Sequence, residues 1–153
     1  MGKSLKTPIL LVEDNDDDAM LIQRTLKSAG VTNPVHRLSD GDAAILYLRK
    51  RIKSRIENSL PKLVLLDLRM SGIQGLEVLQ WIRQQPALAR LRVVVLTVQN
   101  DLREVNRAYA LGANSFLVKP LEIEDAQSFR AFLNAHVLGP IDSSRLPLPV
   151  KVA

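Results

Sequence analysis

Carboxylate side chains are concentrated near the start of the chain, and one more follows a later apolar run. Asp67 comes directly after the apolar residues 63–66. Carboxylates that share a site repel one another, which raises at least one pKa unless a cation neutralises them. Because the chain has no cysteine and only two widely separated histidines, such a site favours a hard divalent ion, Mg²⁺ or Ca²⁺. The early carboxylates fall within six positions: Glu13, Asp14, Asp16, Asp17 and Asp18.

A hydroxyl group and an ammonium group stand at equivalent places after two other apolar runs. Thr97 follows residues 93–96, and Lys119 follows residues 115–118. Such donors neutralise and orient a phosphoryl group, and a carboxylate beside them can act as a nucleophile and form an aspartyl phosphate. Each residue also has a structural explanation, since acids after strands often cap the next helix and threonine favours strands. Their common position at the ends of apolar runs favours the functional explanation.

The apolar runs themselves predict a parallel sheet. They are continuously apolar, as expected of parallel strands covered on both faces. The clearest runs are 9–12, 63–66 and 93–96, and weaker candidates are 34–38 and 115–118. Amphipathic stretches alternate with them and predict helices over 17–29, 41–53, 75–85, 102–111 and 122–137. This alternation predicts an α/β fold with a doubly wound, five-stranded parallel sheet, in which the candidate residues meet at one edge.

Length and composition are those of one globular domain. With 153 residues, 46% of them hydrophobic, the chain can bury a core without disulfides, and it has no cysteine to form them. No apolar run approaches the ~20 residues that span a bilayer. Residues 1–8 lack the apolar stretch of a signal peptide. We therefore expect a cytoplasmic protein without a membrane partner.

The net charge of +5 would by itself suggest an acidic partner such as nucleic acid. The early acidic cluster argues against this partner, and six aromatic side chains are too few for a base-stacking platform. The basic run over residues 49–55 is interpreted as a solvated helix face. We expect no nucleic-acid partner.

Four short motifs together resemble a known family. They are VEDN at 12–15, LLDL at 65–68, LT at 96–97 and VKP at 118–120, and they resemble the CheY-like receiver domains of two-component response regulators. The resemblance covers about residues 8–137, and the segment 111–120 is also similar to stand-alone regulators paired with phytochrome-type histidine kinases. It implies the CheY-like strand order 2-1-3-4-5. It also implies a receiver domain over 1–138, with a proline-rich tail over 139–153 and no separate output domain.

The resemblance implies a role for each matched residue. Asp67 would accept a phosphoryl group from the phosphohistidine of a sensor histidine kinase. Asp14 and Asp67 would bind Mg²⁺ directly, Glu13 would bind it through water, and the Arg69 backbone carbonyl would add a further oxygen.

Thr97 and Lys119 would contact the phosphoryl oxygens. In this family the hydroxyl group then moves toward the phosphate and an aromatic side chain on the fifth strand swings inward. Here those switch residues would be Thr97 and Phe116. The family also has a cis peptide bond after the lysine, which corresponds to Lys119–Pro120, where proline lowers the preference for trans.

Five positions around the expected site depart from the family pattern or flank it. Phe116 stands where tyrosine is common, and a permanently buried core phenylalanine is its alternative interpretation. Val98 replaces a small residue and would narrow access to the phosphoacceptor. Ser71 replaces a proline, which would loosen its loop. Arg69 and Gln99 would influence hydrolysis by admitting or excluding water. We expect a competent site with altered kinetics.

Three other functions fit the sequence less well than a phosphorylatable receiver domain. The main alternative is a pseudo-receiver, a binding or dimerisation module that ignores phosphate, which the departures motivate and the complete set of matched residues disfavours. A phosphohydrolase is disfavoured because Arg69 occupies the place of the second acid that such enzymes need. Dinucleotide binding lacks a G-x-G-x-x-G after a strand. We expect a regulatory phosphoacceptor rather than an enzyme, with only Mg-dependent self-phosphorylation and slow autodephosphorylation.

Self-association is a further expectation. The predicted helix over 122–137 has an apolar stripe, for which core packing is the alternative interpretation, and the tail over 139–153 adds apolar side chains. Because isologous contacts are the commonest in small oligomers, these features predict a homodimer.

Overall fold

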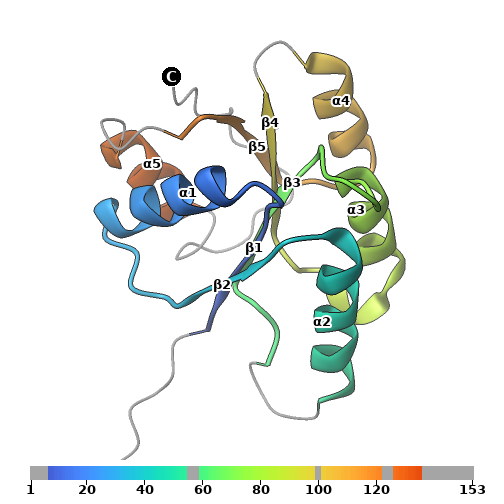
Figure 1. Ribbon diagram of the computed structural model, residues 1–153. Coiled ribbons are helices and arrows are strands. Elements are labelled where there is room, and N and C mark those ends of the chain that lie inside the picture. Colours follow the sequence, from blue (N-terminus) through green and yellow to red (C-terminus); the bar gives the residue numbers. More distant parts are fainter. Residues whose placement is uncertain (1–6, 55–58, 99–100, 122–125, 136–153) are drawn as a thin grey trace, which may run out of the picture.

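The chain folds around a single parallel sheet. The structure is a computed structural model that describes residues 7–54, 59–98, 101–121 and 126–135. Five strands lie in the order β2-β1-β3-β4-β5, and all neighbouring pairs are parallel. The strands are β1 (Ile9–Val12), β2 (Val35–Leu38), β3 (Leu63–Asp67), β4 (Val93–Val98) and β5 (Ser115–Lys119). This arrangement (Figure 1) confirms the predicted fold class and strand order.

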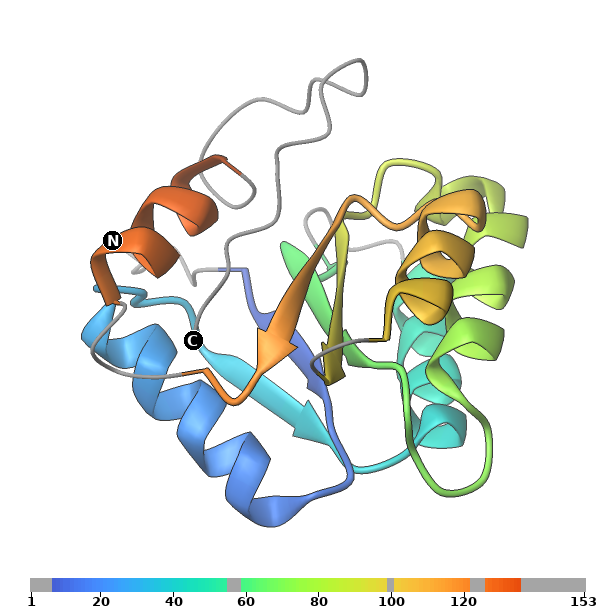
Figure 2. The same ribbon diagram turned by 90° about the horizontal axis from the view of Figure 1, so that it is seen from above.

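Helices cover both faces of the sheet. One face carries α1 and α5, and the other carries α2, α3 and α4 (Figure 2). Their bounds are α1 (Asp16–Ser28), α2 (Gly41–Lys53), α3 (Gly75–Gln84), α4 (Leu102–Ala110) and α5 (Ala126–Leu133). Two hydrophobic cores result, one on each side of the completely buried central strands β1 and β3. The continuous apolar runs therefore have the cause predicted for them, which is burial on both faces.

The predicted helix bounds are close to the observed ones, with differences at the ends. A short 3-10 helix, η1 (Pro86–Leu88), follows α3 and was not predicted. The predicted helix over 122–137 is observed over Ala126–Leu133, and its expected ends at 122–125 and 136–137 lie outside the described residues. The tail over 139–153 also lies outside them, so the domain boundary and the role of the tail stay predictions.

The apolar stripe predicted to support a dimer contact belongs to the core. Phe129, Phe132 and Leu133 on α5 are buried against the sheet and α1. Packing of a helix stripe on its own sheet is the ordinary use of such a pattern. The described part of this stripe is therefore core, as in the alternative interpretation, and it is not a self-association surface.

Two local features bring the elements of the site together. The side chain of Asn15 accepts a hydrogen bond from the Asp18 backbone N–H (2.9 Å) and so caps α1 immediately after β1. Gly75 begins α3, and a Cβ at this position would lie 2.2 Å from the Asp67 carbonyl oxygen. Only glycine allows α3 to start this close to the end of β3.

Among the described residues, no helix combines the length and the apolar character needed to cross a membrane.

Candidate functional site

Three carboxylates from two strand ends meet at one edge of the sheet. Glu13 and Asp14 follow β1, and Asp67 ends β3, which is the neighbouring strand. One carboxylate oxygen of each residue lies within 4.8 Å of the others. Three oxygen donors at this spacing fit a hard divalent cation such as Mg²⁺.

Burial makes the cluster electrostatically costly without a cation. Glu13 is completely buried and Asp67 is 2% exposed, whereas Asp14 is half-buried. Burial, aided by the Asp67 carboxylate and opposed by Lys119, raises the pKa of Glu13 from 4.5 to about 7. A bound cation would offset this cost and hold the carboxyl group ionised.

Lys119 lies in the middle of the carboxylates. Its Nζ lies 3.0 Å from Glu13 Oε2, 3.2 Å from Asp18 Oδ2 and 3.3 Å from Asp67 Oδ2. Burial alone would lower the pKa of Lys119, but the Asp67 and Glu13 carboxylates together raise it above its usual value. The ammonium group is therefore charged, and it partly neutralises the site. The peptide bond between Lys119 and Pro120 is cis.

Asp18 is a member of this arrangement for which the sequence predicted no role. It belongs to the early acidic cluster, but nothing in the sequence distinguished it from Asp16 or Asp17. Its contact with Lys119 joins residues 101 positions apart.

Ser71 restrains Asp14, contrary to the loosening predicted for this loop. The Ser71 backbone N–H donates to Asp14 Oδ2 (3.1 Å), and its hydroxyl group lies 3.4 Å from the same oxygen. A proline has no N–H and could not make the first bond. The departure from the family pattern thus adds a donor to a candidate metal ligand.

Arg69 connects the end of β3 with α4. Its backbone N–H donates to Asp67 Oδ1 (3.1 Å), and its guanidinium group forms ion pairs with Asp101 and with Glu104 (3.4 Å). The side chain is 63% exposed. The metal-binding role of its carbonyl oxygen stays a prediction.

The two expected switch residues lie on β4 and β5. Thr97 is buried, and within the described residues its hydroxyl group makes one long contact (3.4 Å), with the Val98 carbonyl oxygen. Phe116 is half-buried and meets the Tyr109 ring edge-on, with ring centroids 6.1 Å apart. It is therefore not the fully buried core residue of the alternative interpretation. Val98 is 42% exposed, and Gln99 lies outside the described residues.

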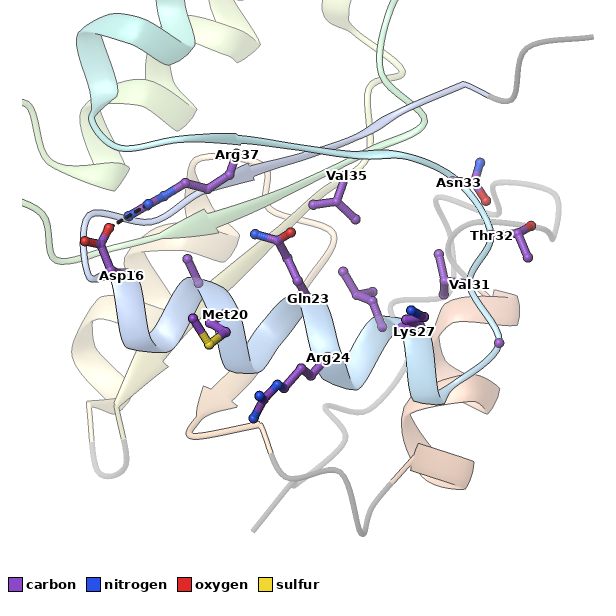
Figure 3. Close-up of a pocket in the computed structure, with 13 residues that line it drawn as sticks. Asp16, Met20, Gln23, Arg24, Lys27, Val31, Thr32, Asn33, Val35 and Arg37 are labelled. Atoms are coloured by element: carbon purple, nitrogen blue, oxygen red, sulfur yellow. Dashed lines mark hydrogen bonds and ion pairs between the residues drawn. The ribbon is translucent and has the colours of Figure 1, made fainter.

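Arg37 holds the backbone beside the cluster. Its Nε donates to the Glu13 carbonyl oxygen (2.9 Å), and its Nη1 forms an ion pair with Asp16 (2.7 Å). Arg37 and Asp16 line an open groove of about 1030 Å³ between α1 and β2 (Figure 3). The three clustered carboxylates do not line this groove, so it is separate from the candidate site.

The comparisons with known proteins agree with this geometry. The family model described as the response regulator receiver domain matches residues 9–129. The chain belongs to the response regulator receiver family. As a receiver domain it is a response regulator of two-component systems, which work with histidine kinases, and the family is not a classical enzyme family. The resemblance expected from the sequence motifs is confirmed.

Several relatives of this receiver domain are known. The probable methanogenesis regulatory protein FilR2 of Methanothrix harundinacea is 45% identical over 117 residues, covering 76% of this chain and 74% of that protein. Response regulator Rcp1 of Synechocystis is 40% identical over 118 residues, covering 76% of this chain and 79% of that protein.

Solved structures have the same fold. The phosphorylated cyanobacterial phytochrome response regulator RcpA has a TM-score of 0.72 and 31% identity, over 90% of this chain and 97% of that one. The Mn²⁺-bound form of Rcp1 has a TM-score of 0.70 and 35% identity, and the match covers 92% of this chain and 99% of that one.

Proposed function

We propose that this receiver domain is a phosphorylatable switch in which Asp67 accepts a phosphoryl group from a sensor histidine kinase. The observation that carries the proposal is the position of the buried Asp67 carboxylate, which lies 3.3 Å from the Lys119 ammonium group and in one cluster with two further carboxylates. The phosphorylated state of the similar regulator RcpA supports it.

The transfer is a displacement at phosphorus. A carboxylate oxygen of Asp67 forms a bond to the phosphorus of the phosphohistidine while the P–N bond breaks, and the imidazole nitrogen keeps the electron pair. Lys119 then pairs with the new phosphoryl oxygens, and the weakly held Thr97 hydroxyl group donates to them. Both groups already lie at the same edge of the sheet as the nucleophile.

Mg²⁺ is the proposed cofactor. Glu13, Asp14, Asp67 and the Arg69 carbonyl oxygen would hold it, as the three-carboxylate cluster and the Mn²⁺-bound form of Rcp1 support. When bound, such an ion neutralises charge on the phosphoryl oxygens.

The output of the switch is a change of protein surface. Thr97 would move toward the phosphate, and Phe116 would follow it and leave Tyr109. A phytochrome-type kinase is the proposed partner, because RcpA is a phytochrome response regulator. The same proposal includes a downstream target protein that recognises the changed surface, and a cytoplasmic location.

The test is phosphorylation of the full chain by acetyl phosphate with and without Mg²⁺. Intact-mass measurement is expected to show one added phosphoryl group on the wild type with Mg²⁺. Asp67→Asn is expected to show none, because it removes the nucleophile. Asp42→Asn, a first-turn aspartate on α2, is the control and is expected to behave as the wild type. An unlabelled wild type would contradict the proposal and favour the pseudo-receiver.

A further inference from the structure

The Lys119 ammonium group has three carboxylate partners, and they differ in burial. The exposed fraction of the side chain is 0% for Glu13, 3% for Asp67 and 36% for Asp18. An ammonium group has three N–H donors, so these three partners can take all of them. A newly arrived anion therefore competes with these three carboxylates for the N–H donors of Lys119.

Asp18 is the partner that is released most easily. Glu13 is fully buried, and a buried carboxylate left without its cation is strongly destabilising. A third-exposed carboxylate can instead be solvated by water when its ion pair opens.

The helix alone does not explain this contact. Asp16, Asp17 and Asp18 all lie in the first turn of α1, where negative side chains are stabilised by the helix dipole. Asp16 pairs with Arg37 and Asp17 is exposed, whereas the Asp18 side chain is directed at Lys119. Asp17 therefore provides a matched control with the same charge and nearly the same helix position.

We propose that Asp18 is a positioning residue that holds Lys119 at the pocket and competes with the phosphoryl group on Asp67 for it. This inference rests on the proposed function. Each formation of the aspartyl phosphate replaces the Lys119–Asp18 ion pair by a Lys119–phosphoryl ion pair. Asp18 thus opposes the phosphorylated state, and its removal shifts the balance toward that state.

The test measures the affinity of the full chain for beryllofluoride, an analogue of the phosphoryl group, at saturating Mg²⁺ by ¹⁹F NMR. Asp18→Asn is expected to bind it roughly threefold to tenfold more tightly than the wild type, the range for one partly exposed charged hydrogen bond. Asp17→Asn is expected to change the affinity by less than about twofold. Asp18→Glu keeps the charge and is expected to stay near the wild-type value.

Two further measurements separate this role from simpler ones. Mg²⁺ affinity without beryllofluoride is expected to stay equal or fall in Asp18→Asn, because Lys119 then pairs more closely with Glu13 and Asp67. The tightening by Asp18→Asn is expected to vanish in a Lys119→Gln background. Equal tightening in both backgrounds would indicate plain charge repulsion and would overturn the positioning role.

The proposal and the function beneath it fail differently. A wild type that binds no beryllofluoride would contradict the phosphorylatable switch itself. A wild type that binds it, with Asp18→Asn matching Asp17→Asn, would overturn only the role of Asp18.

Discussion

At the residue scale, Glu13 shows how a site can be built at a cost to the fold. Its carboxylate is completely buried next to Asp67, and Lys119 is shared with two other acids. A buried carboxylate that shares its one cation with two other acids lowers the free energy of unfolding. The same negative charge favours binding of a divalent cation at the cluster.

Glu13→Gln is therefore expected to have opposite effects on stability and on metal binding. In metal-free buffer the free energy of unfolding should rise by about 1 kcal/mol, because removal of the buried charge outweighs the loss of the Asn15 N–H bond to Glu13 Oε1 (3.2 Å), while the amide oxygen still accepts from Lys119. The stabilisation by added Mg²⁺ should become smaller. Thermal unfolding with a chelator and with Mg²⁺ measures both effects. Glu77→Gln, an exposed glutamate on α3, is the control. A less stable metal-free Glu13→Gln would contradict the argument.

At the scale of the elements, Arg83 links α3 to η1 and to the turn between α4 and β5, and in the described part of the chain it forms no ion pair. Arg83 of α3 donates to the Gly112 carbonyl oxygen (2.9 Å), the Leu88 carbonyl oxygen (3.1 Å) and Asn114 Oδ1 (3.1 Å). Asn114 Oδ1 also accepts from the Val93 backbone N–H at the start of β4 (2.8 Å). Arg83 thus ties α3 and η1 to the α4–β5 turn, where Gly112 has a φ of +101°. The planar guanidinium group suits this task because its donors point in fixed directions.

Arg83→Lys is expected to lower the free energy of unfolding by about 1–3 kcal/mol, because one ammonium group cannot reach all three oxygens and leaves acceptors unpaired. Urea unfolding measures the loss. Arg90→Lys, an exposed arginine nearby, is expected to change stability by less than about 0.5 kcal/mol. If the two variants were equally stable, the contacts of Arg83 would have no energetic weight.

At the scale of the whole molecule, the acidic site and the basic residues of α2 lie apart. The acidic site lies at one edge of the sheet, whereas basic residues lie on α2, where Arg49 lies over the Trp81 ring and Arg51 over the Tyr47 ring. These contacts agree with the solvated helix face predicted for residues 49–55, since guanidinium groups commonly lie over aromatic rings at protein surfaces. The absence of a nucleic-acid partner stays a prediction.

Homodimer formation also stays a prediction, and its surface must be sought away from the buried α5 stripe. Leu102 at the start of α4 is 68% exposed and lies near the switch residue Thr97 in sequence. We expect a homodimer by light scattering, favoured by beryllofluoride with Mg²⁺ and weakened by Leu102→Glu. Leu46→Glu, which changes a 54% exposed leucine on α2, is the control and should leave the mass unchanged. A monomeric mass of the wild type, both with and without beryllofluoride and Mg²⁺, would contradict this expectation.

The sequence by itself determined the layers of the fold and the residue types at the site. Burial on both faces of a parallel strand requires continuous apolar runs, so the runs at 9–12, 63–66 and 93–96 marked the central strands. Parallel strands end at a common edge, and this placed Asp67 and Lys119 together before any contact was known.

Only the tertiary structure decided which of these side chains touch. The contact of Asp18 with Lys119, the bonds from Ser71 to Asp14 and the three acceptors of Arg83 depend on strand register and on how each helix is rotated. The same applies to the α5 stripe, whose burial depends on the sheet it packs against. Local sequence patterns encode the burial of a segment, whereas the pairing of distant polar atoms follows from the packing of all segments together.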